Sequence, residues 1–329
     1  MDYALLAAGT LSDLLSQVGS LIAFAVVMGA IVIAYVYLFD WGERKIAARI
    51  QSRHGPTHTG KFGLLQGAAD MIKLMAKENI MPHGAENPLF VLIMPMLFSL
   101  FVIIIAFIPL TGTFVGIETT YGLLVVFAMI ALVPLLMFLL GWASGNKFSE
   151  ISAQRAVMTL MSYEIPLLLV VISVALAAGS YSISAIVAAQ HSYWYVFAMP
   201  LGFVVAFVAM LAAMEIPPFD IEESEGELVS GNFTDLGAHY YALARLFGYM
   251  RIFIGVMLMA LLFFGGWLGF SKAPFLSLMI KVVLLSVPIM VIRVISVRMR
   301  IDRIIKLGWI YLMPLAIVNL LIAFFLFSR

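Results

Sequence analysis

Residues 214–231 read Met-Glu-Ile-Pro-Pro-Phe-Asp-Ile-Glu-Glu-Ser-Glu-Gly-Glu-Leu-Val-Ser-Gly, a stretch that separates two long apolar runs of the chain. Six of the 18 acidic residues of the protein lie between Glu215 and Glu227. An acidic loop of a membrane protein can simply be solvated or attract cations. Carboxylates this close, however, do not ionise independently, and their protons leave as a coupled set. Placed after a rigid Pro-Pro-Phe turn, they indicate a device that holds and passes protons or responds to a neighbouring charge.

The regions around this loop are too apolar for a soluble protein. Of the 329 residues, 64% are hydrophobic and 11% charged, and the mean hydropathy is +1.08, whereas soluble domains carry about 25% charged residues. Crossing a bilayer takes roughly 20 apolar residues. Eight runs are long enough: 20–41, 90–110, 121–142, 156–178, 194–214, 248–270, 274–295 and 308–327. We predict an all-α integral membrane protein of eight transmembrane helices in a single domain, 1–329.

Positive charges predict the orientation of these runs. Most of the 19 Lys and Arg residues fall in the connections that follow the first, third, fifth and seventh runs. Because such residues collect on the cytoplasmic side of membrane proteins, we expect these odd-numbered connections to be cytoplasmic and both termini to face outward. The acidic loop follows the fifth run and therefore opposes the positive bias of its side. This position indicates a protein partner or a proton path rather than anionic lipid.

The first cytoplasmic connection contains a second helix-forming segment, 61–78. Its apolar residues recur at three- and four-residue spacing and its polar residues take the opposite face, which is typical of a helix lying in the membrane interface. The two sets are Leu64, Leu65, Ala68, Met71, Ile72 and Met75, and Gln66, Asp70, Lys73 and Lys77. Such a helix commonly serves only as an anchor. The alternative is that it borders an entrance for a lipid-soluble molecule.

Glu164 and Lys281 are ionisable residues inside predicted spans. Glu164 lies within the fourth run beyond Arg155, and an ionisable residue at membrane depth is a functional candidate by default. A helix beginning at Pro166 would instead make Glu164 an interfacial cap. We favour function, because the apolar stretch begins before Glu164. Lys281 lies near the outer end of the seventh run, where we expect its ammonium group to snorkel to the surface.

The composition excludes several kinds of chemistry. The chain has no Cys, which rules out thiolate-ligated iron–sulfur clusters, disulfides and thiol catalysis. None of its five His residues lies in the middle of an apolar run, which argues against a haem held by two histidines. We therefore expect no metal site and no bound redox cofactor. If the protein serves redox chemistry, the electrons travel on other subunits.

Four blocks of sequence, in order, resemble a single family. They are Glu43–Lys45 with Gly55-Pro56, Gly63–Gln66 and Ala69-Asp70; Gly141–Ser144 through Arg155 to Ser162–Pro166; Pro218–Asp220 through Glu227–Val229 to Gly231; and Arg298–Asp302 with Leu307–Trp309 and Leu312–Leu315. Together they resemble the H subunit of proton-pumping NADH:quinone oxidoreductase, respiratory complex I. The resemblance extends from about Asp40 to Leu315.

This resemblance implies a subunit that forms much of the chamber into which quinone slides from the bilayer, and that couples quinone reduction to proton translocation. Its partners would be peripheral-arm subunits carrying the terminal iron–sulfur cluster, antiporter-like membrane subunits and lipid, in the inner or plasma membrane of a prokaryote, with no nucleic acid. The implied chamber residues are Glu43, Arg44, Arg53, Asp70, Phe219 and Asp220. The implied proton-coupling residues are Glu164, Glu215, Asp220, Glu223, Glu225 and Glu227.

The chain departs from the family pattern just before the acidic loop. The family usually has Glu-Thr-Asn-Arg before Pro-Phe-Asp, whereas residues 213–217 here read Ala-Met-Glu-Ile-Pro. The Arg is absent, and either Glu215 replaces the missing carboxylate or the pathway differs. Val297 also stands where the family usually has Pro.

These departures leave alternatives open. One is a related complex that oxidises reduced coenzyme F420 or ferredoxin and reduces methanophenazine or a quinone, and another is a membrane-bound hydrogenase. The Glu-x-Glu-x-Glu pattern of the loop favours the quinone-type branch. A stand-alone proton/cation antiporter is disfavoured, because we find no inverted repeat in the sequence. A purely structural anchor for a soluble redox module is the third possibility.

Overall fold

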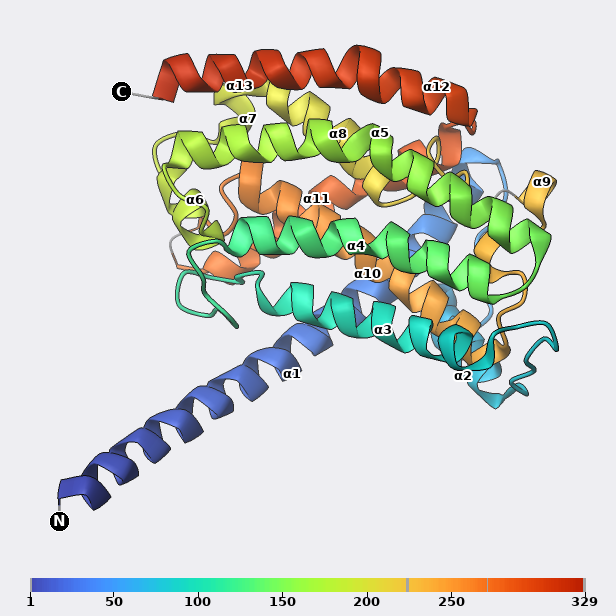
Figure 1. Cartoon of the computed structure of the whole chain (residues 1–329), viewed down its shortest axis with the longest axis horizontal. Helices are drawn as coiled ribbons and strands as arrows, with labels where there is room; N and C mark the ends of the chain where they lie inside the picture. Colours follow the sequence, from blue (N-terminus) through green and yellow to red (C-terminus); the bar gives the residue numbers. More distant parts are fainter. Residues whose placement is uncertain (1, 223–224, 271, 328–329) are drawn as a thin grey trace.

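A computed structural model describes residues 2–222, 225–270 and 272–327 of the protein (Figure 1). This part of the chain is helical with connecting loops, which confirms the all-α prediction. Its α-helices are α1 (Asp2–Ile50), α2 (Gln66–Ala76), α3 (Asn87–Ala106), α4 (Gly122–Ala143), α5 (Lys147–Ala178), α6 (Ile183–Ala189), α7 (Tyr195–Ala198), α8 (Pro200–Ala213), α9 (Glu225–Leu228), α10 (Ala238–Phe263), α11 (Pro274–Ile295), α12 (Ile301–Lys306) and α13 (Met313–Phe327).

Within the described residues, seven helical stretches are long and apolar enough to cross a membrane. They are Val18–Ile50, Pro88–Ala106, Gly122–Ala143, Lys147–Ala178, Ala238–Phe263, Pro274–Ile295 and Ile301–Phe327. The fifth predicted run, 194–214, is divided before Pro200, and its main part is the 14-residue α8. At about 1.5 Å per residue, such a helix covers about 21 Å of the roughly 30 Å of hydrocarbon. The predicted count of eight is thus approximate: it comprises seven long helices and one short apolar helix.

Helix α10 is the centre of the bundle. Every residue from Met250 to Phe263 is buried. Helices α1, α2, α3, α8 and α11 all pack against α10. In Figure 1, α13, α5, α4 and α3 lie in a row from top to bottom, and α5 contacts both α4 and α13. The polar residues of α10 are therefore held from several sides.

Helix α1 continues well beyond the predicted end of the first span. It ends at Ile50, so Glu43 and Arg44 lie on this helix rather than in a connection. Its N-terminal part projects away from the bundle in Figure 1. In the part that packs on the bundle, buried residues recur about one turn apart: Phe24, Met28, Val32, Val36 and Phe39. This stripe fixes the rotation of α1 and turns Asp40 inward.

Helix α5 passes through Pro166 without a break. Asn146 caps its first turn by accepting a hydrogen bond from the Phe148 amide at 3.0 Å, and Gly179, with φ 67°, ends it. Proline is tolerated inside membrane helices because neighbouring groups satisfy the freed carbonyl. The helix does not begin at Pro166, so Glu164 lies in its interior and is not its cap.

The last span combines α12, a π-type turn over Leu307–Leu312 and α13. This span packs along α5. A Cβ atom on Gly308 would lie 2.1 Å from the carbonyl oxygen of Ser162, so only glycine permits this approach.

Candidate functional site: a charged cavity beside the acidic loop

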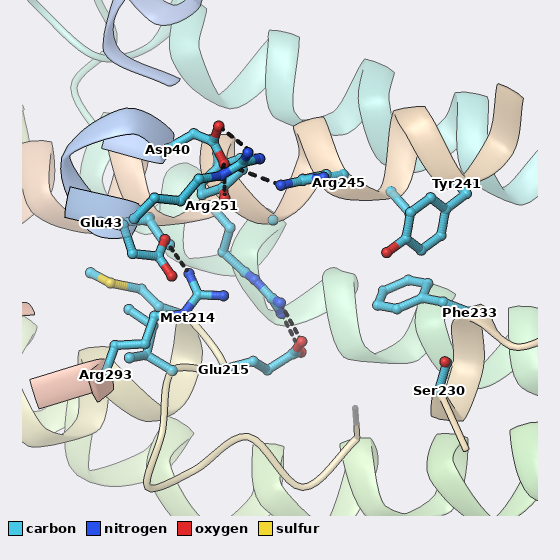
Figure 2. Close-up of a pocket in the computed structure, with 16 residues that line it drawn as sticks. Asp40, Glu43, Met214, Glu215, Ser230, Phe233, Tyr241, Arg245, Arg251 and Arg293 are labelled. Carbon is cyan, nitrogen blue, oxygen red and sulfur yellow. Dashed lines mark hydrogen bonds and ion pairs between the residues drawn. The ribbon is translucent and has the colours of Figure 1, made fainter. Parts of the chain in front are cut away.

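A cavity of about 400 Å³ lies between α1, α10, α11 and the loop that follows α8 (Figure 2). Its lining is Asp40, Glu43, Arg44, Met214, Glu215, Ile216, Ser230, Phe233, Tyr241, Ala244, Arg245, Gly248, Tyr249, Arg251, Ile252 and Arg293. In Figure 2, Asp40, Glu43 and Arg293 lie on one side, and Tyr241 and Phe233 face each other on the opposite side. The cavity thus has a charged wall and an aromatic wall.

Asp40 is the centre of the charged wall. Its Oδ1 accepts hydrogen bonds from Tyr249 at 2.7 Å and from Arg245 at 3.2 Å, both on α10. Its Oδ2 lies 3.1 Å from Arg44, one turn further along α1. A buried carboxylate needs partners of this kind, because desolvation of a lone charge is costly. Asp40 therefore ties α1 to α10 at the rim of the cavity.

Arg44 also extends this network to α2. Its Nη1 donates to Asp70 at 2.9 Å, and Gln66 donates to the other oxygen of Asp70 at 2.9 Å. Burial alone would raise the pKa of Asp70, but the hydrogen bonds from Arg44 and Gln66 outweigh it and hold that pKa below its ordinary value. The polar face of α2 thus turns toward the cavity, while Ile72 and Met75 are exposed on its outer side. This is the arrangement expected of a helix in the membrane interface.

Side chains of α1 also hold the loop that leads into α2. Three of them lie one turn apart and each donates to a backbone carbonyl: Tyr37 to Leu64, Trp41 to Phe62 at 3.1 Å, and Lys45 to Pro56 at 2.7 Å. Arg53, a predicted chamber residue, lies in this loop. It is exposed, bonds Gln51 at 2.8 Å and does not line the cavity.

Glu43 and Glu215 each pair with one arginine at the wall of the cavity. Glu43 accepts from Arg293 of α11 at 3.1 Å, and Glu215 forms a two-pronged pair with Arg251 of α10. The side chains of Glu215 and Arg251 are each 9% exposed. Together with the bonds to Asp40, each carboxylate that lines the cavity in the described part of the chain has a guanidinium partner.

The backbone aims Glu215 at its partner. The amide of Glu215 donates to Ala212 at 3.1 Å and that of Ile216 to Leu211 at 3.2 Å, the paired bonds of a Schellman motif that ends α8. Glu215 takes the left-handed position of this motif, with φ 53°, where glycine is usual. The cap turns the chain at the C-terminal end of α8 and places the Glu215 carboxylate in the cavity wall.

Further acidic groups lie past Glu215, on the side of α5. Glu222 is 3% exposed, and its charge and that of Glu215 both act on the buried phenol of Tyr163. Glu164, the next residue on α5, is half-buried. Among the residues that the structure describes, no ion pair reaches Glu164. The carbonyl of Glu222 accepts a hydrogen bond from Ser152 of α5 at 2.7 Å. Glu215, Glu222 and Glu164 thus gather around Tyr163 on the side of α5.

The rest of the acidic loop is bound at its base. Asp220 accepts from Arg298 at 2.8 Å, and the Met299 amide donates to Pro218 at 3.0 Å. Burial raises the pKa of Asp220, and the Arg298 charge opposes that rise only in part. Phe219 is buried and, like Asp220, does not line the cavity.

The end of the loop contacts α5. The Glu227 carboxylate is exposed and accepts from Arg155 at 2.8 Å, a bond that lowers its pKa. Glu223, a predicted coupling residue, lies outside the described residues. Glu225 begins α9, and its side chain is likewise outside what the structure describes.

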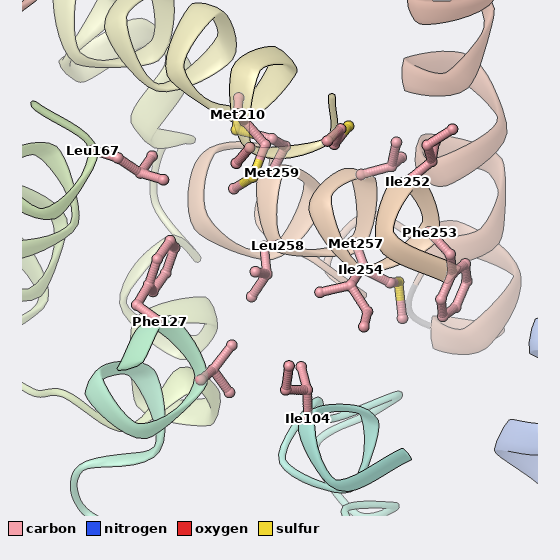
Figure 3. Packing of buried hydrophobic residues seen from close by; sticks show 14 of the residues in the cluster. Ile104, Phe127, Leu167, Met210, Ile252, Phe253, Ile254, Met257, Leu258 and Met259 are labelled. Carbon is pink, nitrogen blue, oxygen red and sulfur yellow. The ribbon is translucent and has the colours of Figure 1, made fainter. Parts of the chain in front are cut away.

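Beyond Arg251, α10 becomes entirely apolar and closes the cavity toward the membrane. Figure 3 shows Met257 and Leu258 of α10 in one cluster with Ile104 of α3, Phe127 of α4 and Leu167 of α5. A close-packed apolar layer of this kind holds no water between its side chains. The polar part of α10 therefore ends at Arg251.

The far end of α10 is fastened by two side chains. The Lys281 ammonium group donates to the carbonyls of Phe264, Gly266 and Leu268 and lies 4.7 Å from the centre of the Trp194 ring. The Gln190 amide donates to Leu261 at 2.9 Å and accepts from the Gly265 amide at 2.9 Å. A cation at a helix C-terminus satisfies carbonyls that lack partners. Lys281 is thus bound by the protein, where we expected snorkelling to the surface.

Glu43, Arg44 and Glu215 were predicted as site residues from the sequence, and all three line the cavity. Several other lining residues were not predicted. Asp40, Arg245, Tyr249, Arg251 and Arg293 line it as well. One signal was available, because Arg251 lies within a predicted apolar run and an ionisable residue there indicates function.

Comparison with known proteins agrees with these observations. The family model of NADH dehydrogenase matches residues 22–324. The H subunit of the NADH-quinone oxidoreductase of Bacillus cytotoxicus is 36% identical over 304 residues, and that of Bacillus mycoides is 38% identical over 305, each match covering 90% of both chains. The resemblance carried by the four sequence blocks is confirmed. This chain belongs to the NADH dehydrogenase family.

Proposed function

We propose that this chain is the H-type membrane subunit of a proton-translocating NADH:quinone oxidoreductase, and that its cavity receives the quinone headgroup. Relatives that match most of the chain carry the name of that subunit. The cavity itself carries the proposal, because it combines four arginines and three carboxylates with the rings of Tyr241 and Phe233. Aromatic rings suit the flat quinone, and arginines suit an oxygen that gains negative charge on reduction.

The proposed route from the bilayer passes beside α2. Ile72 and Met75 are exposed on its outer face, and Asp70 on its inner face joins Arg44 of the cavity. A lipid-soluble molecule that follows the apolar face therefore needs to pass only the edge of one helix before it meets charged groups. The loop held by Tyr37, Trp41 and Lys45 lies at this edge.

The proposed mechanism gives this chain the handling of charge. Electrons come from an iron–sulfur cluster in a peripheral-arm partner, and the absence of Cys here fits that division. Each carboxylate of the cavity pairs with an arginine, so a reduced headgroup competes for the same guanidinium groups. A carboxylate that loses its cation takes up a proton. That change then acts on Glu222, Tyr163 and Glu164, and through them on neighbouring membrane subunits.

The proposed setting is the inner or plasma membrane of a prokaryote, with the odd-numbered connections in the cytoplasm. The bacterial relatives and the distribution of Lys and Arg support it. The acidic loop and the cavity then face the peripheral-arm subunits, and antiporter-like subunits adjoin this chain within the membrane.

The test uses the assembled complex in proteoliposomes, with NADH-driven quinone reduction and proton uptake recorded together. Arg293→Gln and Glu43→Gln each break one pair of the charged wall. We expect both variants to slow quinone reduction in complexes that assemble normally. The exposed Lys272→Gln is the matched control and is expected to behave as wild type. Unchanged rates in both cavity variants would contradict the proposed function.

A further inference from the structure

We infer that His239 is a positioning residue: it holds the C-terminal end of α2 against α10 and so keeps in place the helix beside which quinone is proposed to enter. The inference rests on the proposed function and deepens it, because it names a contact that sets the position of α2. It is carried by the way in which α2 is attached to the rest of the chain.

Helix α2 is attached by polar contacts rather than by burial. The structure describes all 11 of its residues, and none of them is buried. Ile72 and Met75 are 67% and 69% exposed. The bilayer holds such an amphipathic helix at the interface, but it does not fix where the helix lies against the bundle. That position therefore depends on individual hydrogen bonds.

The N-terminal half of α2 is attached to α1. Asp70 pairs with Arg44 at 2.9 Å. A Cβ atom on Gly67 would lie 3.1 Å from Oδ2 of Asp40, so α2 passes close to α1 at this point. This half of the helix is thus held by the same network that forms the charged wall of the cavity.

The C-terminal end of α2 is attached to α10 by His239. The Nε2 atom of His239, in the first turn of α10, lies 2.9 Å from the carbonyl oxygen of Met75, in the last turn of α2. A carbonyl oxygen only accepts, so the imidazole N–H is the donor. The last carbonyls of a helix lack partners within the helix, and a His side chain can supply one. This one bond therefore caps α2 and joins it to α10.

The chain that leaves α2 also lies against the start of α10. A Cβ atom on Gly237 would lie 1.9 Å from Oδ1 of Asn79 and 3.0 Å from the carbonyl oxygen of Ile80. The segment after α2 therefore passes close over the residue that precedes α10. Helix α2 thus reaches from α1 to α10, and both of these helices contribute side chains to the cavity.

Loss of the His239 bond would free one end of α2 while the other end stays attached to α1. The helix would then occupy its position for only part of the time, and the apparent affinity for a molecule that needs this position falls by the same fraction. His239 is not among the residues that line the cavity, so the reaction of a bound headgroup is unaffected. A long apolar tail still lies beside α2 when the headgroup is in the cavity, whereas a short tail does not reach it. We therefore expect an effect on KM for long-tailed quinones and not on kcat.

The experiment uses the assembled complex with His239→Leu, His239→Gln and, as a matched control, His191→Leu at an exposed residue. Hydrogen exchange of the α2 amides is followed by mass spectrometry. KM and kcat of NADH-driven reduction are measured for a quinone with a long apolar tail and for the same headgroup with a short tail.

We expect His239→Leu to speed exchange in α2 and to raise KM for the long-tailed quinone roughly 5-fold, the factor that corresponds to one ordinary hydrogen bond. The kcat and the KM for the short-tailed quinone should not change. The side-chain amide of Gln can donate in place of the imidazole Nε2–H, so His239→Gln is expected to restore both readouts. His191→Leu is expected to behave as wild type.

Three outcomes would overturn the inference. Unchanged exchange in α2 of His239→Leu would show that the bond does not hold the helix. Faster exchange with an unchanged KM would show that the position of α2 does not control access. A His239→Gln variant that behaves as His239→Leu would show that the hydrogen bond is not the cause. Failure of the proposed function looks different: Glu43→Gln and Arg293→Gln would leave quinone reduction unchanged, while exchange in α2 would still respond to His239→Leu.

Discussion

Glu215 and Arg251 are 36 residues apart in sequence and meet face to face beside the cavity, one from the cap of α8 and the other from the interior of α10 (Figure 2). The pair is nearly excluded from solvent. It joins the short helix that precedes the acidic loop to the helix at the centre of the bundle. This electrostatic contact therefore helps to fix the position of the acidic loop.

Replacing Glu215 by glycine sets two effects against each other. Glycine relieves the left-handed backbone at this residue, a gain of about 1–2 kcal/mol, but it also leaves Arg251 buried without its partner, a loss of about 3–5 kcal/mol. The loss is larger, so we expect Glu215→Gly to lower the unfolding temperature of the complex in detergent. Glu215→Gly combined with Arg251→Met removes the stranded charge and is expected to recover much of that stability. A single variant as stable as wild type would show that the ion pair contributes little.

Gly231 fixes the return of the acidic loop. A Cβ atom there would lie 1.8 Å from the carbonyl oxygen of Glu222, and its φ of 55° is also unfavourable for other residues. We therefore expect Gly231→Ala to displace the loop and reduce the yield of assembled complex. Gly84→Ala is the matched control, because nothing lies within 4 Å of its Cβ position. Equal yields for the two variants would contradict the structure of the loop.

The contact between Asp220 and Arg298 predicts a pH-dependent effect. Burial raises the pKa of Asp220 and Arg298 lowers it, so Arg298→Gln should raise this pKa further. A carboxyl group with a raised pKa opposes folding as the pH climbs above its ordinary value, about 3.9 for Asp. The part of the Arg298→Gln destabilisation that comes from Asp220 should therefore be absent at low pH, where Asp220 is protonated in both proteins, and should grow as the pH rises from the Asp220 pKa of the wild type to the higher pKa of the variant.

Thermal unfolding of the complex across a pH series measures this effect. Asp220→Asn provides the control, because the pH-dependent part of the Arg298→Gln effect should vanish in its background. A destabilisation that is the same at every pH would show that Arg298 acts through packing alone.

Lys281 predicts a stability effect at the opposite end of α10. Lys281→Met keeps the apolar stem but removes the ammonium donor of the Phe264 and Gly266 carbonyls, while the Leu268 carbonyl still accepts from Ser277. Buried acceptors that lose a partner cost about 1–3 kcal/mol, so we expect a lower unfolding temperature with quinone reduction retained in the surviving complex. Lys272→Met, at an exposed residue, should stay within about 0.5 kcal/mol of wild type. Equal unfolding temperatures for Lys281→Met and the wild type would mean that the hydrogen bonds of the Lys281 ammonium group do not stabilise the end of α10.

Much of the architecture was predictable because membrane spans depend on composition. The apolar runs located the long helices, and the spacing of Leu65, Ile72 and Met75 located α2. The fifth run was different, because it is apolar throughout while Pro200 divides it. Hydropathy does not register that break, so the run was predicted as a full span. The end of the first helix was also missed. The apolar run ends at residue 41, but α1 stays helical through its charged residues to Ile50.

Single residues of the site could be predicted from the sequence, but the pairs that they form could not. Glu43, Arg44 and Glu215 followed from local patterns and resemblance, whereas their partners depend on packing. Asp40 and Arg245 are separated by 205 residues and Glu43 and Arg293 by 250. No periodicity in the chain encodes such pairs, because helix rotation and crossing decide which charges meet. Arg53 shows the converse, since its block matches the family while its side chain lies in an exposed loop.

The most direct test of the account is photoaffinity labelling of the assembled complex with a quinone analogue whose headgroup carries the reactive group. The chain is then digested and the labelled residues are identified by mass spectrometry. The account predicts labels on residues that line the cavity, with Tyr241 and Phe233 foremost, and loss of those labels when excess quinone is added. Labels confined to the lipid-facing helices, or labels on the cavity that excess quinone does not displace, would contradict it.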